Sequence, residues 1–463
     1  MILVFTQKVS NCLHYVLKEI FVNRFHQQFE ITQDQNHYLQ ASSDIKIYYT
    51  EYQISDFEGH WVPNSNFLFT ENFQNLNIKK DLPTGIIQFP KNKTIDKTYD
   101  NICNILSIQN DLTTESESFS KRRVYFPIDS HLGFDIFAHV FALIANVEEC
   151  LLRSETMDSD KNGRFDTKNL NFVKQNMHLL PMADLAIERL REFIGLSPSK
   201  ENNFCIIPTA DIDQCFQFKG KSLKKFVGGG IKHPVTLWDR FEYLFTRKDH
   251  FAPSNDLFKY LEIQEKSRLF WLCNLKETEK NKQISRENTD LTLEIEQSKY
   301  HAHIGLHPSY QNFDQQKIYQ EEKDWLEKTA KTNITHSRQH YLHFELPKTY
   351  IELESIGITD DWSMGFANTV GYRNGSSLPV TWFNIFDQKE RNFTIHSFSI
   401  MDVTCKNYLK LNSFYSLQLG TLFKQIIQEI NGQFTFIIHN ESFSEKDGWR
   451  GWKKTFNSWA SNI

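Results

Sequence analysis

The second half of the chain alternates short apolar runs with helical segments, and no other feature limits the possible folds as strongly. The predicted strands lie at 204–209, 269–275, 301–306, 335–340, 358–362, 380–386, 393–398 and 434–439. Helices are predicted at 235–245, 286–298, 316–329, 348–355, 414–430 and 451–459. Repeated strand–helix units favour a parallel sheet. Seven or eight such units in about 260 residues suit a closed (β/α) barrel.

The first half is expected to form an α/β domain of its own. Its predicted elements are a strand at 1–5, a helix at 9–24 and a strand at 44–52. Residues 195–203 contain a glycine, a proline, two serines and two asparagines, and this composition interrupts the pattern. We therefore place the domain boundary there, with an amino-terminal α/β domain at 1–197 and a barrel domain at 198–463.

Composition and charge exclude several classes of function. The 52 basic and 57 acidic residues give a net charge of −5, which argues against a dedicated nucleic-acid binder. No apolar stretch approaches the roughly 20 residues of a membrane span, and residues 1–5 are too short for a signal peptide. The seven cysteines are odd in number and none is spaced C-x-x-C. This usage favours a reduced, cytoplasmic protein.

Carboxylates, imidazoles and an arginine recur where the predicted strands end. In such a barrel, catalysis takes place at the carboxyl ends of the strands. The residues found there include Asp211, Asp213, His307, Arg338, His340, Asp361, His396 and His439. Two carboxylates one residue apart can divide the work, one binding a cation and the other acting as a base. Asp211 and Asp213 by themselves could simply end a strand and cap a helix. The repeated occurrence of such residues at several strand ends favours a functional site.

At these residues the second half resembles the polysaccharide deacetylases, the carbohydrate esterases that share the NodB homology domain. The resemblance covers about residues 204–463. The segments around 158–165 and 180–190 look like the domain of unknown function that precedes the catalytic domain in a divergent branch. The resemblance implies a deformed (β/α) barrel. It also implies a metal-dependent hydrolase that removes an acyl group from an amino sugar or polysaccharide.

The same resemblance implies roles for individual residues. Asp211 matches the catalytic base, Asp213 and His307 match metal ligands, Arg338 matches the residue that orients the base, and His439 matches the general acid. Further contacts with substrate are expected from His340, Asp361, His396 and Trp449.

One position departs from the family pattern. The second histidine of the His-x-x-x-His motif that begins at His307 falls on Gln311. A catalytic zinc site normally has three protein ligands, and an amide is a weak one. We expect a divalent metal, zinc first, on Asp213, His307 and Gln311. His303 precedes His307 by four residues, but the two would lie about 13 Å apart along a strand, so we expect it to be an ordinary strand residue.

Gln311 keeps two alternatives open beside the hydrolase. The first is a catalytically silent carbohydrate-binding relative that kept the barrel and lost the metal. The second is a hydrolase that uses a cation with a preference for oxygen ligands. In each case the expected partner is an acylated carbohydrate, with no nucleic acid and no membrane span.

Two polar segments are interpreted without a function. Residues 158–163 imitate the start of an EF-hand loop, but position 12 would be Asn169 instead of the required glutamate. A polar turn is the better interpretation. Residues 276–282 form a charge run, which we interpret as a solvated loop.

Overall fold

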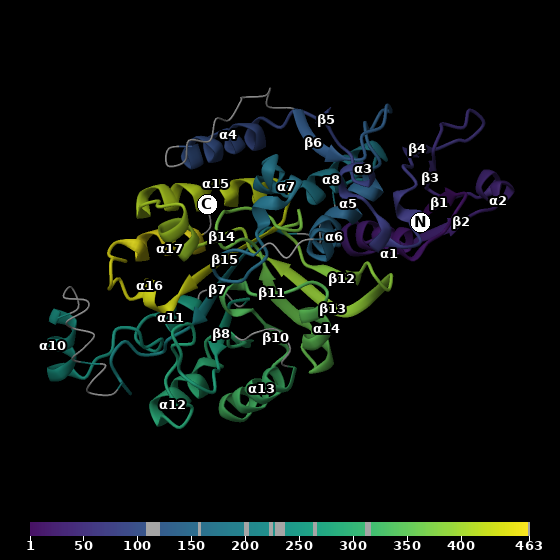
Figure 1. Ribbon diagram of the computed structural model, residues 1–463. Coiled ribbons are helices and arrows are strands. Elements are labelled where there is room, and N and C mark those ends of the chain that lie inside the picture. Colours follow the sequence, from purple (N-terminus) through teal and green to yellow (C-terminus); the bar gives the residue numbers. More distant parts are fainter. Residues whose placement is uncertain are drawn as a thin grey trace.

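The computed structural model describes residues 1–107, 121–155, 159–198, 203–221, 226, 237–262, 266–310 and 316–461. Within these ranges the chain has a mixed α/β fold with sheets of four, nine and two strands. Figure 1 shows the first strands of the amino-terminal half at one side of the molecule and the large sheet near its centre. The described helices are all too short or too polar to cross a lipid bilayer.

The large sheet contains every strand expected in the second half. Its strands are β7 (Cys205–Ile212), β8 (Arg268–Leu272), β9 (His303–His307), β10 (His336–Ser337), β11 (Asp360–Met364), β12 (Val380–Asn384), β13 (Lys389–Ser397), β14 (Ile400–Met401) and β15 (Gln433–His439). Their order is β12-β13-β11-β10-β9-β8-β7-β15-β14. All neighbours are parallel except the β12–β13 pair, which is antiparallel.

The sheet is curled, and the chain itself joins its two ends. β13 lies near one end of the strand order and β14 lies at the other, yet only Phe398 and Ser399 separate them in sequence. Three residue steps span at most roughly 10 Å, so the two ends of the sheet must lie next to each other. This curled sheet is consistent with the expected deformed barrel. It also brings the carboxyl ends of its parallel strands to one rim.

Helices follow most of the strands. They are α10 (Leu237–Thr246), α11 (Leu257–Leu261), α12 (Thr289–Ser298), α13 (Gln316–Ala330), α14 (Lys348–Ser355), α15 (Ser413–Glu429), α16 (Asn440–Phe443) and α17 (Trp452–Ala460). α15 begins where the Asn412 side chain accepts a hydrogen bond from the Tyr415 backbone N–H at 3.0 Å, the usual role of an N-cap asparagine. Gly420 lets α17 approach α15 closely, because a Cβ there would lie 2.1 Å from Trp459 Nε1.

The amino-terminal half has two sheets. β1 (Ile2–Thr6), β2 (Phe29–Thr32), β3 (Ile45–Thr50) and β4 (His60–Pro63) form a parallel sheet, and β5 (Thr84–Gln88) pairs with β6 (Lys121–Tyr125). The helices are α1 (Asn11–Leu17), α2 (Gln35–Gln40), α3 (Ile78–Asp81), α4 (Lys93–Ser107), α5 (Ile136–Ile144), α6 (Val147–Glu155), α7 (Asn171–Lys174) and α8 (Met182–Phe193). The expected helix at 9–24 is α1 continued by a π-helical segment at Lys18–Arg24.

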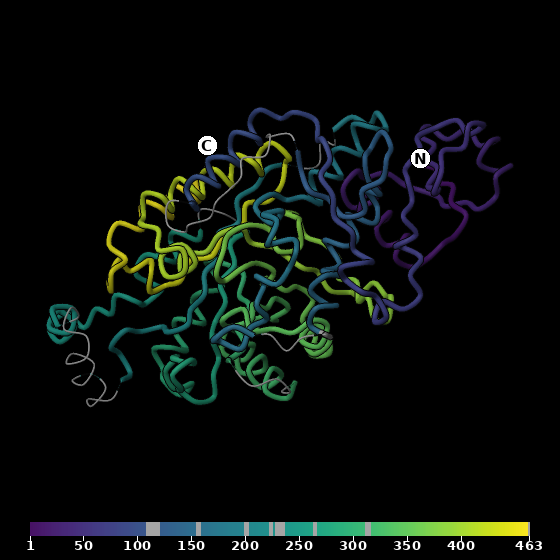
Figure 2. Tube along the Cα trace, turned by 45° about the horizontal axis from the view of Figure 1, so that its top comes forward, coloured from purple at the N-terminus to yellow at the C-terminus, as the bar shows by residue number. Residues whose placement is uncertain are grey.

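The two halves share one hydrophobic core. Tyr15 on α1 donates its hydroxyl to the carbonyl of Thr381 at 2.6 Å. The buried Arg373 guanidinium contacts Glu149 of α6 at 2.6 and 2.9 Å. The amino-terminal helix α4 lies along α15 (Figure 2). The boundary at 197/198 stays a prediction, because the described packing is continuous across it.

Candidate metal centre and cavity

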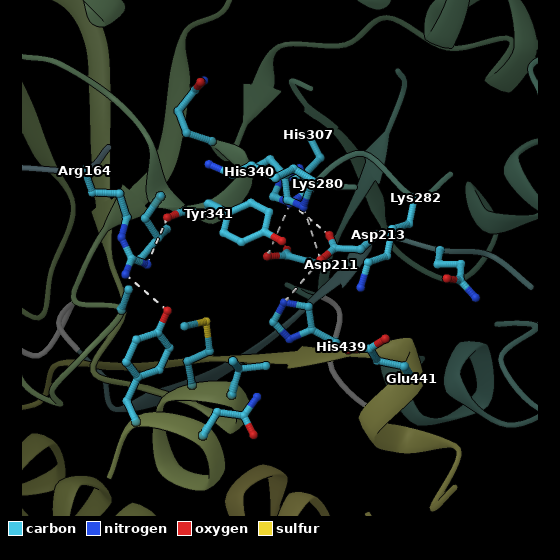
Figure 3. A pocket seen from close by; sticks show the side chains of 18 of the residues that line it. Arg164, Asp211, Asp213, Lys280, Lys282, His307, His340, Tyr341, His439 and Glu441 are labelled. Atoms are coloured by element: carbon cyan, nitrogen blue, oxygen red, sulfur yellow. Dashed lines mark hydrogen bonds and ion pairs between the residues drawn. The ribbon is translucent and has the colours of Figure 1, made fainter. Parts of the chain in front are cut away.

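A cavity of about 470 Å³ opens at the rim where the strands end (Figure 3). Asp211 lies near the end of β7 and Asp213 directly follows it, while His307 ends β9 and His439 ends β15. His340 begins a 3₁₀ turn at His340–Leu342, shortly after β10. These five side chains line the cavity, although they come from four separate segments of the sequence.

The Asp213 carboxylate lies at the centre of three imidazoles. Its Oδ1 is 3.2 Å from Nε2 of His307, and its Oδ2 is 3.3 Å from Nε2 of His340. Nε2 of His439 is 3.9 Å from the same Oδ2. Ligand atoms of Asp213, His307 and His340 all lie within 4.8 Å of one another.

The second nitrogen of each ligand imidazole fixes the direction of its lone pair. His307 Nδ1 lies 2.6 Å from the carbonyl oxygen of Arg338, which can only accept, so Nδ1 carries the hydrogen. His340 Nδ1 lies 3.4 Å from Oδ1 of Asn281, an oxygen that already accepts from the Tyr310 N–H. In the neutral rings both Nε2 atoms therefore present lone pairs to Asp213. This is the arrangement expected of histidines that bind a metal.

The electrostatics of Asp213 fit a cation site. Burial favours the neutral acid, but His340, His307 and His439 outweigh it and hold the pKa of Asp213 well below its usual range. Burial lowers the pKa of His340, so this ring gives up its Nε2 proton readily, and a cation between the ring and Asp213 would take the place of that proton. Among the described residues, none donates a hydrogen bond to the buried Oδ1 of Asp213. Lone pairs and an unpaired carboxylate oxygen facing one point fit a divalent cation with nitrogen and oxygen ligands.

Asp211 is held by a buried arginine. Arg338 donates from Nη1 to Asp211 Oδ1 at 2.7 Å and from Nη2 to the Thr209 hydroxyl at 2.9 Å. The guanidinium also packs over the ring of Phe270, 4.3 Å from its centroid. The other carboxylate oxygen of Asp211 lies 4.0 Å from His307 Nε2. Asp211 is thus fixed at the edge of the candidate metal site.

His439 is held by a second carboxylate. Its Nδ1 lies 2.8 Å from Asp402 Oδ1, and its backbone N–H donates to Asp402 Oδ2 at 2.7 Å. Burial alone would favour the neutral ring, but Asp402, helped by Asp213 and Asp211, raises the pKa of His439 well above its usual value. His439 therefore carries a proton near neutral pH and points its Nε2 toward the cavity.

Three residues that were expected to contact substrate lie away from the cavity. Asp361 is fully buried and accepts hydrogen bonds from Ser337 and Ser363, and burial raises its pKa to about 6. The ring of His396 stacks on Trp362 at 3.9 Å, and Trp449 is buried beneath Lys406. His340, the fourth of these residues, does line the cavity. Its imidazole contacts the Asp213 carboxylate, which places it in the candidate metal site. Gln311, the expected third ligand, lies outside the described residues.

Sequence reasoning passed over several residues that line the cavity. Lys280 and Lys282 belong to the charge run that was interpreted as a solvated loop, and Lys161 belongs to the polar turn. Tyr341 follows His340 with a φ of 61°, a conformation that is rare for a bulky side chain and concentrates at functional sites. No local pattern marks these residues, because their positions depend on contacts between distant segments.

Comparison with known proteins gives one family and several structures. Residues 2–196 match a family described as "Family of unknown function (DUF7033)". No curated protein sequence matches the chain.

Similar solved structures include a putative polysaccharide deacetylase from Mycobacterium smegmatis, with 10% identity and a TM-score of 0.35 over 57% of this chain and 85% of that chain. A polysaccharide deacetylase from Bacillus cereus matches with 8% identity and a TM-score of 0.25 over 56% and 86% of the two chains. IcaB from Ammonifex degensii matches with 12% identity and a TM-score of 0.21 over 35% and 84%.

Proposed function

We propose that this protein is a metal-dependent hydrolase that removes an acyl group from an amino sugar or polysaccharide. The observation that carries the proposal is the placement of two imidazole Nε2 atoms, those of His307 and His340, 3.2 and 3.3 Å from the two oxygens of the Asp213 carboxylate. Such a cluster has no purpose in a packed core, where lone pairs facing a carboxylate would repel one another. The motif resemblance of the second half to polysaccharide deacetylases supplies the substrate class.

Asp213, His307 and His340 would hold the cation. His340 takes the place that the family pattern gives to position 311, so two imidazoles and a carboxylate are available within the described residues. A divalent ion bound by such a set supplies a Lewis acid and lowers the pKa of a bound water. The anchored Nδ1 atoms of both histidines keep the ligands oriented.

The remaining residues move protons. Asp211 accepts a proton from the attacking water, because Arg338 occupies only one of its oxygens and leaves the other toward the cavity. His439 gives its proton to the departing amine or alcohol, and Asp402 stabilises the charged ring before that transfer. The base and the acid both line the cavity beside Asp213, and acyl hydrolysis requires such a division of labour between two residues.

A metal analysis of the purified protein, combined with acetate release from N-acetylated and O-acetylated oligosaccharides, tests this function. We expect about one divalent ion per chain and metal-dependent acetate release that chelation abolishes and added zinc restores. Bound glycan without acetate release would support the silent binder instead. A protein with neither metal nor activity would overturn the proposal.

The two aspartates should not be interchangeable. Asp213→Ala should abolish metal binding, because it removes the carboxylate that lies against both His307 and His340. Asp211→Asn should keep the metal and lose a factor of about 10²–10⁴ in rate, the usual effect of removing a positioned base. Metal content and acetate release, measured on both variants, check the assignment. The opposite pattern would mean that the two roles are reversed.

A further inference from the structure

We propose that the natural substrate carries negative charge close to its acyl group, and that four lysines around the cavity recognise that charge. This inference rests on the proposed function and adds a substrate class to it. The lysines are Lys161, Lys280, Lys282 and Lys410, here called the basic collar. They come from three distant segments of the chain, so their shared position is a property of the fold.

Two lysines of the collar, Lys280 and Lys282, are positioned by a residue that contacts the candidate metal site. Lys280 and Lys282 flank Asn281, whose buried side chain lies against His340 and exchanges hydrogen bonds with the Tyr310 backbone. Because Asn281 points inward, its neighbours are directed to the cavity wall (Figure 3). The ammonium of Lys280 lies 3.5 Å from the centroid of the Tyr310 ring, a cation–π contact that holds it in place.

A third lysine of the collar, Lys161, belongs to the amino-terminal half of the chain. Lys161 lies on a tight turn from Asp160 to Gly163, closed by a 2.9 Å backbone hydrogen bond. The Tyr310 hydroxyl donates to the carbonyl of Asn162 at 2.7 Å and attaches the turn to the barrel. The segment that resembled part of a calcium loop is therefore a wall of the cavity.

The acidic groups of the cavity do not neutralise the collar. Asp211 is paired with Arg338, and the charge of Asp213 would be balanced by the cation that the proposed function places on it. Burial raises the pKa of Glu441, the third carboxyl group in the lining. Arg164, which also lines the cavity, is already paired with Asp160.

The four collar ammonium groups have no ion pair with any carboxylate in the described part of the chain. Several like charges around one cavity repel one another and raise the local concentration of anions. A neutral saccharide would leave this repulsion in place, whereas a carboxylate or phosphate group would relieve it. The collar therefore favours an acylated saccharide with anionic substituents, and its effect should decrease as salt screens the charges.

The test compares substrates that differ only in charge. The probes are an acetylated oligouronate, the same oligomer with its carboxylates converted to methyl esters, and an acetylated oligosaccharide that carries phosphate. Both direct binding and acetate release are measured, in low and in high salt. The protein variants are the triple Lys161→Gln/Lys282→Gln/Lys410→Gln and, as a matched control, Lys79→Gln on α3, an exposed lysine outside the cavity lining.

We expect the wild type to bind a charged oligomer about tenfold more tightly than its neutral ester in low salt, with the difference nearly lost in high salt. The triple variant should lose the same factor for charged oligomers and none for the ester, and Lys79→Gln should behave as the wild type. Comparison of the oligouronate with the phosphate-carrying oligosaccharide shows which anion is preferred.

Equal binding and equal acetate release from charged and neutral oligomers would overturn the inference and leave the proposed hydrolase intact. Charge-selective, collar-dependent binding without acetate release would overturn the hydrolase and keep the anion specificity.

Discussion

At the scale of single residues, His340 shows how far a side chain's role depends on its turn. The apolar run at 335–340 predicts a strand that ends on this histidine, which led to an expected substrate contact. In the structure β10 ends at Ser337, and Tyr341 has a positive φ directly after His340. This turn brings the imidazole over Asp213. The apolar pattern at 335–340 contains no signal for a turn of this kind. The position of His340 beside Asp213 could therefore not be predicted from the sequence.

The variant His340→Ala tests the ligand assignment. Removing one of three protein ligands should weaken zinc binding by more than about 100-fold, since even the loss of an outer partner costs 10- to 100-fold. The measurement is competition for zinc with a chromogenic chelator. His303→Ala is the matched control, because His303 lies on β9, the strand of the proposed ligand His307, but is exposed at the opposite end of that strand. Unchanged zinc affinity in His340→Ala would return the third-ligand role to Gln311.

Asp211, Asp213, His307, Arg338 and His439 were singled out by their positions at strand ends, and the structure brings them to one rim. Polar residues at or directly after the carboxyl end of a regular strand were therefore predicted correctly to lie at this rim. The strand-end argument fails for His396, which belongs to β13 but stacks on Trp362 and contacts Asp360 at 2.7 Å. Side-chain direction alternates along a strand, so one residue of offset decides whether a polar group reaches the cavity.

At the scale of elements, most strands and helices of the second half were predictable to within a few residues. The helix expected at 316–329 is α13, and the one expected at 348–355 is α14. The short helices α11 and α16 were not predicted, and the two shortest strands also differ from expectation. β10 has only two residues, and β14 is the continuation of β13 beyond a bend at Phe398 and Ser399. Both follow from the curling of the sheet, which no local pattern records.

Gly305 in β9 makes room for the Phe270 ring, on which Arg338, the partner of the proposed base Asp211, packs. A Cβ at this position would lie 2.4 Å from Phe270, the ring on which Arg338 packs. Gly305→Ala should therefore displace Phe270 and cost about 1–3 kcal/mol of unfolding free energy, as overpacked cores do. It should also lower activity, since Arg338 holds Asp211. Urea unfolding and acetate release check both effects. A variant with native stability and rate would show that the ring can move without disturbing Arg338.

At the scale of the whole molecule, the halves are more closely joined than the composition break at 195–203 suggested. The break marks a connection, but the residues that join the halves are distant from it. Arg373 of the barrel half lies between Glu149 and Gly365, and Asp184 of α8 accepts hydrogen bonds from Ser376 and Ser377. These side-chain contacts of Glu149 and Asp184 join residues that are 192 to 224 positions apart in the sequence. A single sequence contains no signal that shows which distant residues will be in contact.

The Arg373–Glu149 pair should contribute strongly to stability. Glu149→Gln leaves the Arg373 guanidinium buried with a weaker partner, so we expect a loss of about 3–5 kcal/mol at pH 7. Burial opposes the charged carboxylate, but Arg373 and Arg153 outweigh it and lower the pKa of Glu149 to about 2. The contribution is therefore complete above the ordinary carboxyl range and is lost as the pH falls toward about 2.

Urea unfolding of the wild type and Glu149→Gln between pH 7 and pH 3 measures this contribution. The difference in unfolding free energy should shrink as the pH falls below about 4.5. Glu192→Gln, at the exposed end of α8, should change stability by less than about 0.5 kcal/mol. A pH-independent difference would locate the effect in packing and not in the charge of Glu149.

In the proposed function, the turn from Asp160 to Gly163 separates recognition from chemistry along the chain. The side chains proposed to act on the acyl bond come from the barrel, whereas Lys161, a proposed anion contact, enters from the amino-terminal half. Descendants of this gene could change which glycan they accept by mutating a few surface positions, while the strands that carry the reaction remain under stricter selection. A molecule divided in this way can diversify in its first half and inherit the reaction unchanged in its second.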